Sequence, residues 1–218
     1  MIIIEIIKLF NYFNIPDYEP IVEMARRKGV CVMVDNTFGM GGYLFRPFEW
    51  GAHVSVHSAT KWIGGHGTAL GGVVVDGGNF DWSAEKYPLL AAPSESYHGL
   101  VYKDVFGPAA FAGRVRVDGL RNIGPSASPF NSFLMLQGLE TLSLRAERCC
   151  DNALAVAEFL EKHPAVESVN YPGLKSNPYH ELGCKYLKHG FGGVLTFRVK
   201  GGFEAAAALV TRLELILH

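Results

Sequence analysis

The sequence predicts an α/β protein in which a helix leads into a buried strand, followed by a smaller α+β part. Residues 17–29 have the signals of a helix, with Asp17 suited to the N-cap and Gly29 to the stop. The run Val30 to Val34 is apolar without polar alternation, which is typical of a parallel strand covered on both faces. Asp35 then falls at the C-terminal end of that strand, where open α/β sheets bind ligands.

Two further strands are expected around a short turn. Residues 52–57 alternate between apolar and polar side chains, and residues 72–75 form another apolar run. Lys61 therefore lies in a turn between two strands. Residues 76–108 are rich in aromatic residues, Pro and Gly, and they predict a long ordered loop with one short helix.

A long helix is predicted over residues 130–163, with a candidate kink at Gly138. Its apolar face would consist of Phe133, Leu134, Leu136, Leu139, Leu142 and Leu144. Upstream of this helix, Arg114, Arg116 and Arg121 are interleaved with valines, which favours strand or packing roles over a basic patch.

The C-terminal part predicts a smaller α+β domain. Strands are expected at 166–171 and 194–199, and helices at about 179–188 and from Phe203 onward. The domain junction is placed along the long helix, which divides the chain into residues 1–145 and 146–218.

Composition restricts the class of protein. The 218 residues are 49% hydrophobic and 19% charged, as in a soluble globular protein, and the net charge of −1 gives no electrostatic reason to expect nucleic acid or an anionic membrane as partner. The four cysteines form no CxxC pair, which favours a reducing, cytoplasmic location. The apolar opening, residues 1–10, lacks a basic start and is too short to cross a bilayer, so we expect neither a signal peptide nor an anchor.

The pairing of Asp35 with Lys61 predicts a pyridoxal 5′-phosphate site. A lysine can condense with the cofactor's aldehyde, and an aspartate can keep the pyridine nitrogen protonated. Ser58 and Thr60 flank the lysine at alternate positions, so both hydroxyls could face the phosphate. The alternatives are a surface lysine, an aspartate that caps a turn, and hydroxyls that satisfy only backbone.

Other kinds of site have weaker support. The segment GGHGTALGG lacks the GK[ST] ending of a phosphate loop and has GxGxxxG rather than GxGxxG spacing, so its glycines are interpreted as turn residues. His53 and His57 would lie about 13 Å apart on a strand, too far to share one metal ion. No GxSxG motif suggests a serine hydrolase.

Longer motifs resemble a known family. VDNTF and HSATKWIGGHG are similar to the aspartate and lysine motifs of the pyridoxal phosphate enzymes of cysteine and methionine metabolism. Further segments, among them FGPAAFAGRVRVDGLRNIGPSASPFNSFLMLQGLETLSLRAER, VNYPGL and HGFGGVLTF, resemble the O-acetylhomoserine sulfhydrylase branch. The resemblance extends from Ile15 to about Leu217. It implies part of an aspartate aminotransferase-like (fold type I) large domain over residues 1–145 and a partial small domain over 146–218.

The resemblance also implies a reaction. Acetate on the γ-carbon of O-acetylhomoserine would be replaced by sulfide to give homocysteine, with Lys61 as the general base and a lowered pKa supplied by its burial. Family members are roughly twice this long. For a protein of that full length, the resemblance implies a homodimer or homotetramer. The family's asparagine seven positions before Asp17, which helps to hold the cofactor ring, is replaced by Phe10, and Asn11 is the only nearby substitute.

Three alternatives remain open at this stage. A cystathionine lyase or synthase of the same family would use the same Lys61 and Asp35. An inactive remnant would act at most as a binding module. A nucleotide-dependent oxidoreductase would use the glycine-rich turn and bind nicotinamide without Lys61.

Overall fold

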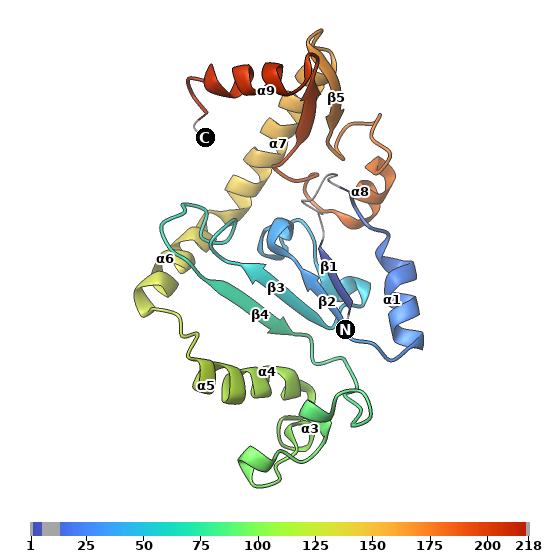
Figure 1. Cartoon of the computed structure of the whole chain (residues 1–218), viewed down its shortest axis with the longest axis vertical. Helices are drawn as coiled ribbons and strands as arrows, with labels where there is room; N and C mark the ends of the chain where they lie inside the picture. Colours follow the sequence, from blue (N-terminus) through green and yellow to red (C-terminus); the bar gives the residue numbers. More distant parts are fainter. Residues whose placement is uncertain (1, 6–13, 217–218) are drawn as a thin grey trace. The chain divides into compact units, whose positions relative to one another are not determined.

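The computed structural model of the chain, shown in Figure 1, describes residues 2–5 and 14–216. It consists of two compact units, the first combining Met1–Ile6 with Asp17–Leu142 and the second combining Ile7–Pro16 with Ser143–His218. The sheet and the Lys61 turn belong to the first unit. The two units reflect how the chain packs. The predicted division into a cofactor-binding domain, residues 1–145, and a small domain, residues 146–218, stays a prediction.

The described strands of the first unit form one sheet in the order β1-β2-β3-β4. The strands are β1 (Ile2–Glu5), β2 (Val32–Asp35), β3 (Val54–Ser58) and β4 (Gly72–Asp76). β1, β2 and β3 are parallel, and β4 is antiparallel to β3 with Ser58 opposite Gly72. The C-terminal ends of β2 and β3 and the beginning of β4 therefore lie at the same end of the sheet. This confirms the predicted placement of Asp35 at the C-terminal end of its strand.

Helix α1 (Tyr18–Arg27) confirms the predicted first helix. Asp17 occupies the N-cap position but its side chain makes no capping hydrogen bond, contrary to the prediction. Instead, Tyr18 is buried and stacks on Phe45, with ring centroids 4.7 Å apart. The 3₁₀ helices η1 (Thr37–Gly42) and η2 (Pro47–Trp50) connect β2 to β3.

The segment after β4 is more helical than predicted. It contains the α-helices α2 (Pro88–Ala91) and α3 (Tyr102–Phe106) and the 3₁₀ helices η3 (Glu95–Tyr97) and η4 (Gly107–Ala109). Trp82 packs edge-on against Phe80 and Tyr87, at centroid distances of 4.7 and 5.2 Å. Aromatic packing orders short helices that have no periodic signal of their own.

Residues 110–123 are helical throughout, which contradicts a strand role for the interleaved valines, whereas the packing role holds for Val117, which packs against the buried core. α4 (Ala110–Arg114) continues into the π-helical turn η5 (Val115–Leu120) and α5 (Arg121–Ile123). Arg114 pairs with Asp118 at 2.8 Å. That ion pair joins residues four apart, which face each other on a helix but not on a strand.

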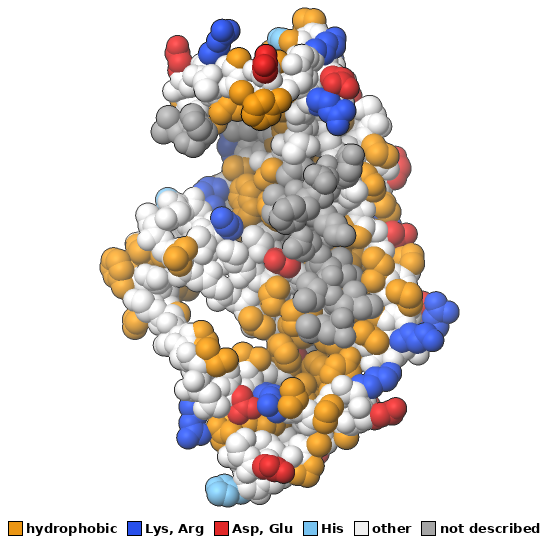
Figure 2. Space-filling model, in the orientation of Figure 1, with side chains coloured by type: hydrophobic (Ala, Val, Ile, Leu, Met, Phe, Trp, Pro, Cys, Tyr) orange, Lys and Arg blue, Asp and Glu red, His pale blue; other side chains and the backbone are white. Residues whose placement is uncertain are grey.

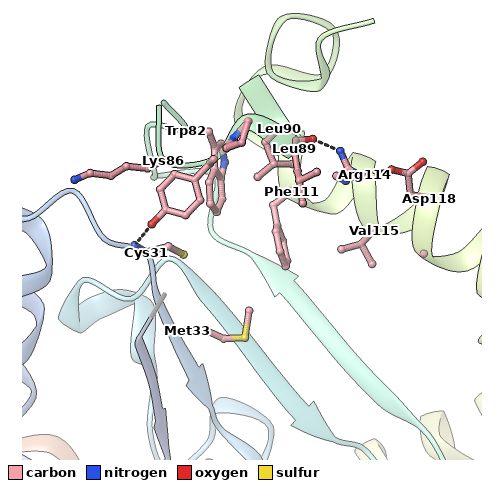
Figure 3. A pocket seen from close by; sticks show the side chains of 13 residues that line it. Cys31, Met33, Trp82, Lys86, Leu89, Leu90, Phe111, Arg114, Val115 and Asp118 are labelled. Atoms are coloured by element: carbon pink, nitrogen blue, oxygen red, sulfur yellow. Dashed lines mark hydrogen bonds and ion pairs between the residues drawn. The ribbon is translucent and has the colours of Figure 1, made fainter. Parts of the chain in front are cut away.

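An apolar cavity of about 500 Å³ lies between this helical segment, α2 and the start of β2. Figure 3 shows Phe111 and Met33 at the cavity, with the Arg114 and Asp118 side chains farther along the helical segment. The backbone N–H of Cys31 donates a hydrogen bond to the Tyr87 hydroxyl at 2.8 Å, which ties the strand to the loop above it.

Burial of Cys31 predicts a loss of stability at alkaline pH. Burial, with a smaller contribution from Asp76, raises the pKa of the Cys31 thiol from 9.0 to about 11. Above the unfolded value the unfolded chain releases this proton and the folded chain does not. The stabilisation is therefore complete below that pH and is lost as pH rises toward the folded value.

The test is urea unfolding of the natural chain and of Cys31→Ala between pH 9.0 and about pH 11, which compares how much stability each protein loses. The natural chain should lose about 2 kcal/mol more than the variant. Parallel curves for the two proteins would contradict it, because all other titrating groups are shared.

The predicted long helix is divided into α6 (Pro129–Glu140) and α7 (Leu142–Glu161). The break falls at Thr141, with φ −106° and ψ 7°, and not at Gly138. The predicted apolar face is also wrong for the most part. Leu142 is buried, whereas Phe133, Leu136, Leu139 and Leu144 are exposed. Figure 2 shows hydrophobic side chains at the left of the view, where Figure 1 places α6.

The second unit confirms the predicted order of strands and helices. After α7 come β5 (Val166–Asn170), α8 (His180–Tyr186), β6 (Thr196–Val199) and α9 (Gly202–Thr211), and β5 pairs antiparallel with β6. Tyr171 is buried and donates to the Gly192 carbonyl at 2.8 Å. None of the described helices combines the length and apolar character needed to cross a bilayer.

Candidate functional site

Asp35 is held at the strand ends by Thr37. Its Oδ1 accepts hydrogen bonds from the Thr37 backbone N–H at 3.0 Å and from the Thr37 hydroxyl at 2.6 Å. The same hydroxyl accepts the Ser58 N–H at 2.8 Å, so one threonine connects the end of β2 to the end of β3. Both bonds to Asp35 within the described chain use Oδ1, which leaves Oδ2 for a ligand. No role was assigned to Thr37 from the sequence.

Asp35 and Ser58 line one open cavity of about 710 Å³. Arg116 reaches the same cavity from the π-helical turn, a role that its interleaved valines did not suggest. The remaining lining residues come from β3, β4 and the helical segment, namely Val56, His57, Gly72, Val73, Val74, Val115, Gly119, Leu120 and Pro125. A carboxylate, a hydroxyl and a guanidinium thus face one space.

His57 is one of the residues that line this cavity. Its Nδ1 is buried without a hydrogen-bond partner, while Nε2 lies 3.0 Å from the Ser55 hydroxyl. Burial lowers the pKa of His57, and the nearby charge of Asp35 partly offsets that shift. His53 instead accepts the Val32 N–H on Nδ1 at 2.9 Å. Within the described residues no three His, Cys, Asp or Glu side chains are grouped as a metal site would require.

Lys61 lies in the turn that follows β3, three residues after Ser58. Its backbone N–H donates to the Ser58 carbonyl at 3.2 Å, and its carbonyl accepts the Gly65 N–H at 2.8 Å. Its side chain is exposed, and its Nζ makes no hydrogen bond or ion pair to any described residue. The expected burial of Lys61 is therefore not present in this chain. Lys61 also does not line the cavity of Asp35, although it lies in the turn that follows Ser58.

Thr60 is engaged with the backbone. Its hydroxyl accepts the Gly71 N–H at 3.0 Å and lies 3.3 Å from the Gly71 carbonyl. This geometry matches the alternative in which a loop hydroxyl satisfies backbone groups. The glycines after the lysine act as turn residues, as predicted, with positive φ at Gly65 and Gly67.

Helix α6 packs against the turn that contains Lys61. The sequence did not predict this contact. Asn131 Nδ2 donates to the Leu70 carbonyl at 3.2 Å. At Gly138 an added Cβ would lie 2.5 Å from the Ile63 carbonyl oxygen and 2.3 Å from that of Gly64. Asn131, Met135 and Gly138 have helical spacing, and this face, not the leucine-rich one, packs on the turn. The only signal in the sequence is a glycine within an apolar helix.

The residues present fit a pyridine cofactor with a phosphate group. Asp35 Oδ2 can accept a hydrogen bond from a protonated ring nitrogen, and Ser58 and Arg116 offer donors suited to phosphate. A lysine is available in the adjoining turn.

Comparison with known proteins agrees with this geometry. Residues 10–218 match the family described as Cys/Met metabolism PLP-dependent enzyme. The chain belongs to this family. The roles of Asp35 and Lys61 stay predictions.

Similar proteins carry out sulfur amino acid chemistry. The chain is 53% identical over 205 residues to O-acetyl-L-homoserine sulfhydrylase 1 of Thermus thermophilus, covering 94% of this chain and 49% of that protein. It is 56% identical over 190 residues to homocysteine/cysteine synthase of Kluyveromyces lactis, covering 86% and 43%. The chain thus spans about half the length of the curated relatives that it matches.

Solved structures share the fold. An O-acetylhomoserine (thiol)-lyase structure from Campylobacter jejuni, which contains N′-pyridoxyl-lysine-5′-monophosphate, matches with a TM-score of 0.92 and 37% identity over 99% of this chain and 54% of that one. Cystathionine γ-synthase from Xanthomonas oryzae matches with a TM-score of 0.75 and 31% identity, covering 99% and 47%. The chain has the fold of part of these fold type I structures. Phe10 and Asn11, where the sequence departs from the family pattern, lie outside the described residues.

Proposed function

We propose that this chain carries the lysine and aspartate part of an enzyme that replaces the acetate of O-acetylhomoserine with sulfide to give homocysteine. The observation that supports it best is the shared cavity of Asp35 and Ser58, next to the Lys61 turn, in a chain more than half identical to sulfhydrylases. The substrate is a small amino acid, and no nucleic acid or membrane takes part.

Each site residue has a role set by its contacts. Asp35 Oδ2 would accept a hydrogen bond from the protonated ring nitrogen while Thr37 fixes Oδ1. Ser58 donates to a phosphate oxygen. The Thr60 hydroxyl donates to the Gly71 carbonyl at 3.3 Å, so it would have to exchange this hydrogen bond in order to donate to the same phosphate.

Lys61 carries the proton transfers. When bound, pyridoxal phosphate supplies an aldehyde that condenses with amines and a protonated ring that withdraws electrons. With the cofactor bound, Lys61 Nζ would hold its aldehyde and, once the substrate amine has displaced it, would take the proton from the substrate Cα and then from Cβ. Acetate would leave from Cγ, hydrogen sulfide would bond to Cγ with loss of its proton, and Lys61 would return protons to Cβ and Cα to give homocysteine. Asp35 keeps the ring protonated throughout, which is the largest electrostatic contribution that we assign.

The reaction requires more than this chain. Strand β4 ends the described sheet, and Val73, Val74 and Val75 on it are exposed. An apolar edge strand of this kind is prone to pair with another chain. We propose that the other half of the fold covers it and that the complete enzyme is a cytoplasmic homodimer or homotetramer. The four free cysteines support a reducing compartment.

Borohydride treatment after incubation with pyridoxal phosphate should leave a stable pyridoxyl adduct on Lys61, found by peptide mass spectrometry. Lys61→Arg keeps the charge but cannot condense with the aldehyde, so its labelling should fall to the background of surface lysines. Lys175→Arg is the matched control, because Lys175 is also exposed but lies in the second unit. Equal labelling of Lys61 and Lys175 would contradict the cofactor site.

A complementation assay separates the alternatives. The chain is mixed with the N-terminal half of the Thermus thermophilus relative, pyridoxal phosphate and O-acetylhomoserine, with sulfide in one reaction and cysteine in a second. Homocysteine that depends on Lys61 supports the sulfhydrylase, whereas a keto acid or cystathionine supports a lyase or synthase. Absence of both product and adduct would support the remnant. Nicotinamide binding that survives Lys61→Ala would support the oxidoreductase.

A further inference from the structure

A thiol and an imidazole face each other on α8, in the second unit. Cys184 Sγ lies 3.6 Å from His180 Nε2. The two residues are four apart and therefore lie on the same side of the helix. Cys184 is exposed, so a small molecule in solution can reach its sulfur. Neither residue belongs to the cavity of Asp35.

The His180 ring is held in one orientation. Its Nδ1 lies 2.8 Å from the Pro172 carbonyl oxygen, which can only accept, so the Nδ1 proton occupies that hydrogen bond. The ring also stacks on Phe191, with centroids 5.2 Å apart and planes at 23°. In the neutral imidazole, Nε2 then carries the lone pair that faces Cys184.

A nucleophile, a base and a group that orients the base form the arrangement that activates cysteines in proteins. Cys184, His180 and the Pro172 carbonyl supply these three parts from contacts within one unit. The other thiols differ in access, because Cys31 and Cys150 are buried and Cys149 is half-buried. They serve as internal comparisons.

We infer that Cys184 is a reactive thiol that forms mixed disulfides with low-molecular-weight disulfides, with His180 as the base. The Cys184 proton moves to His180 Nε2, and the sulfur attacks one sulfur of the small disulfide. The S–S bond of that disulfide breaks, one half stays bonded to Cys184, and the other half leaves as a thiolate that takes the proton from His180. One disulfide is exchanged for another, so the reaction needs no further oxidant. The inference does not depend on the proposed function.

Labelling of the full chain with the neutral disulfide dithiodipyridine tests it, with released thione followed by absorbance and sites mapped by mass spectrometry. Because only a few per cent of a free thiol is ionised at neutral pH, Cys184 should react about tenfold faster than a small cysteine derivative in the same buffer. A rate equal to that of the free derivative would overturn the inference.

Variants identify the base. His180→Phe keeps a ring that can stack on Phe191 but removes both nitrogens, and it should reduce the Cys184 rate about tenfold, to that of free cysteine. His163→Phe, which alters another histidine of the same unit, should leave the rate unchanged. Buried Cys150 reports unfolding, since a variant that opens the unit labels there too.

His180→Gln provides the second variant if His180→Phe exposes Cys150. It offers an amide in place of the imidazole and cannot take the proton at neutral pH. Its Cys184 rate should fall by the same factor. Rates that stay at the natural value in a folded His180 variant would overturn the inference.

Discussion

Asp35→Asn should weaken binding of pyridoxal phosphate at Lys61 by roughly tenfold to a hundredfold, the value of a hydrogen bond to a charged group. The amide oxygen of asparagine can still accept both hydrogen bonds from Thr37, so the local backbone should keep its geometry. What disappears is the negative charge that keeps a ring nitrogen protonated. The measurement is the fraction of Lys61 labelled after borohydride treatment, as a function of cofactor concentration.

Asp76→Asn is the matched control. Asp76 also ends a strand and also accepts two hydrogen bonds, in its case from the backbone N–H groups of Gly78 at 3.0 Å and Ala112 at 3.1 Å. Asp76 is paired with Val54 at the opposite end of the strands from Asp35, because β4 runs antiparallel to β3. Its substitution should leave the labelling curve in place. Equal losses in the two variants would show that the effect is general destabilisation and would remove Asp35 from the site.

Gly138→Ala should lower the free energy of unfolding by about 2 kcal/mol, because the new Cβ collides with the backbone carbonyls of Ile63 and Gly64. Alanine is the better helix former, so intrinsic propensity alone predicts a gain of up to about 1 kcal/mol. The sign of the change therefore separates close packing from propensity. Since the displaced carbonyls follow Lys61 in the same turn, Lys61 labelling should fall as well.

Gly119→Ala is the comparison for stability. Gly119 lies in the π-helical turn, and a methyl group added there would meet no other atom within 4 Å, so alanine should be neutral or stabilising by up to about 1 kcal/mol. Thermal or urea unfolding of both variants provides the measurement. A stabilised Gly138→Ala would mean that α6 does not press on the Lys61 turn.

These predictions depend on different kinds of information. The chemical identities of Asp35 and Lys61 were available from the sequence, because few other functions place a carboxylate at a strand end and a lysine in a hydroxyl-bearing turn. The motifs around them also predicted the family that the comparisons show. The strands and α1 followed from apolar runs and from helix start and stop signals, which are local properties of the chain.

The tertiary structure decided how the side chains are used. The fold joins Asp35 and Ser58 through Thr37, brings Arg116 to their cavity, binds Thr60 to Gly71 and leaves Lys61 exposed. It also packs α6 through Gly138 and not through its leucines. Periodicity records which residues are apolar, but burial depends on what lies opposite each face. Only long-range packing supplies that neighbour, so the sequence by itself determined the chemistry and the local elements, whereas the fold determined contact and exposure.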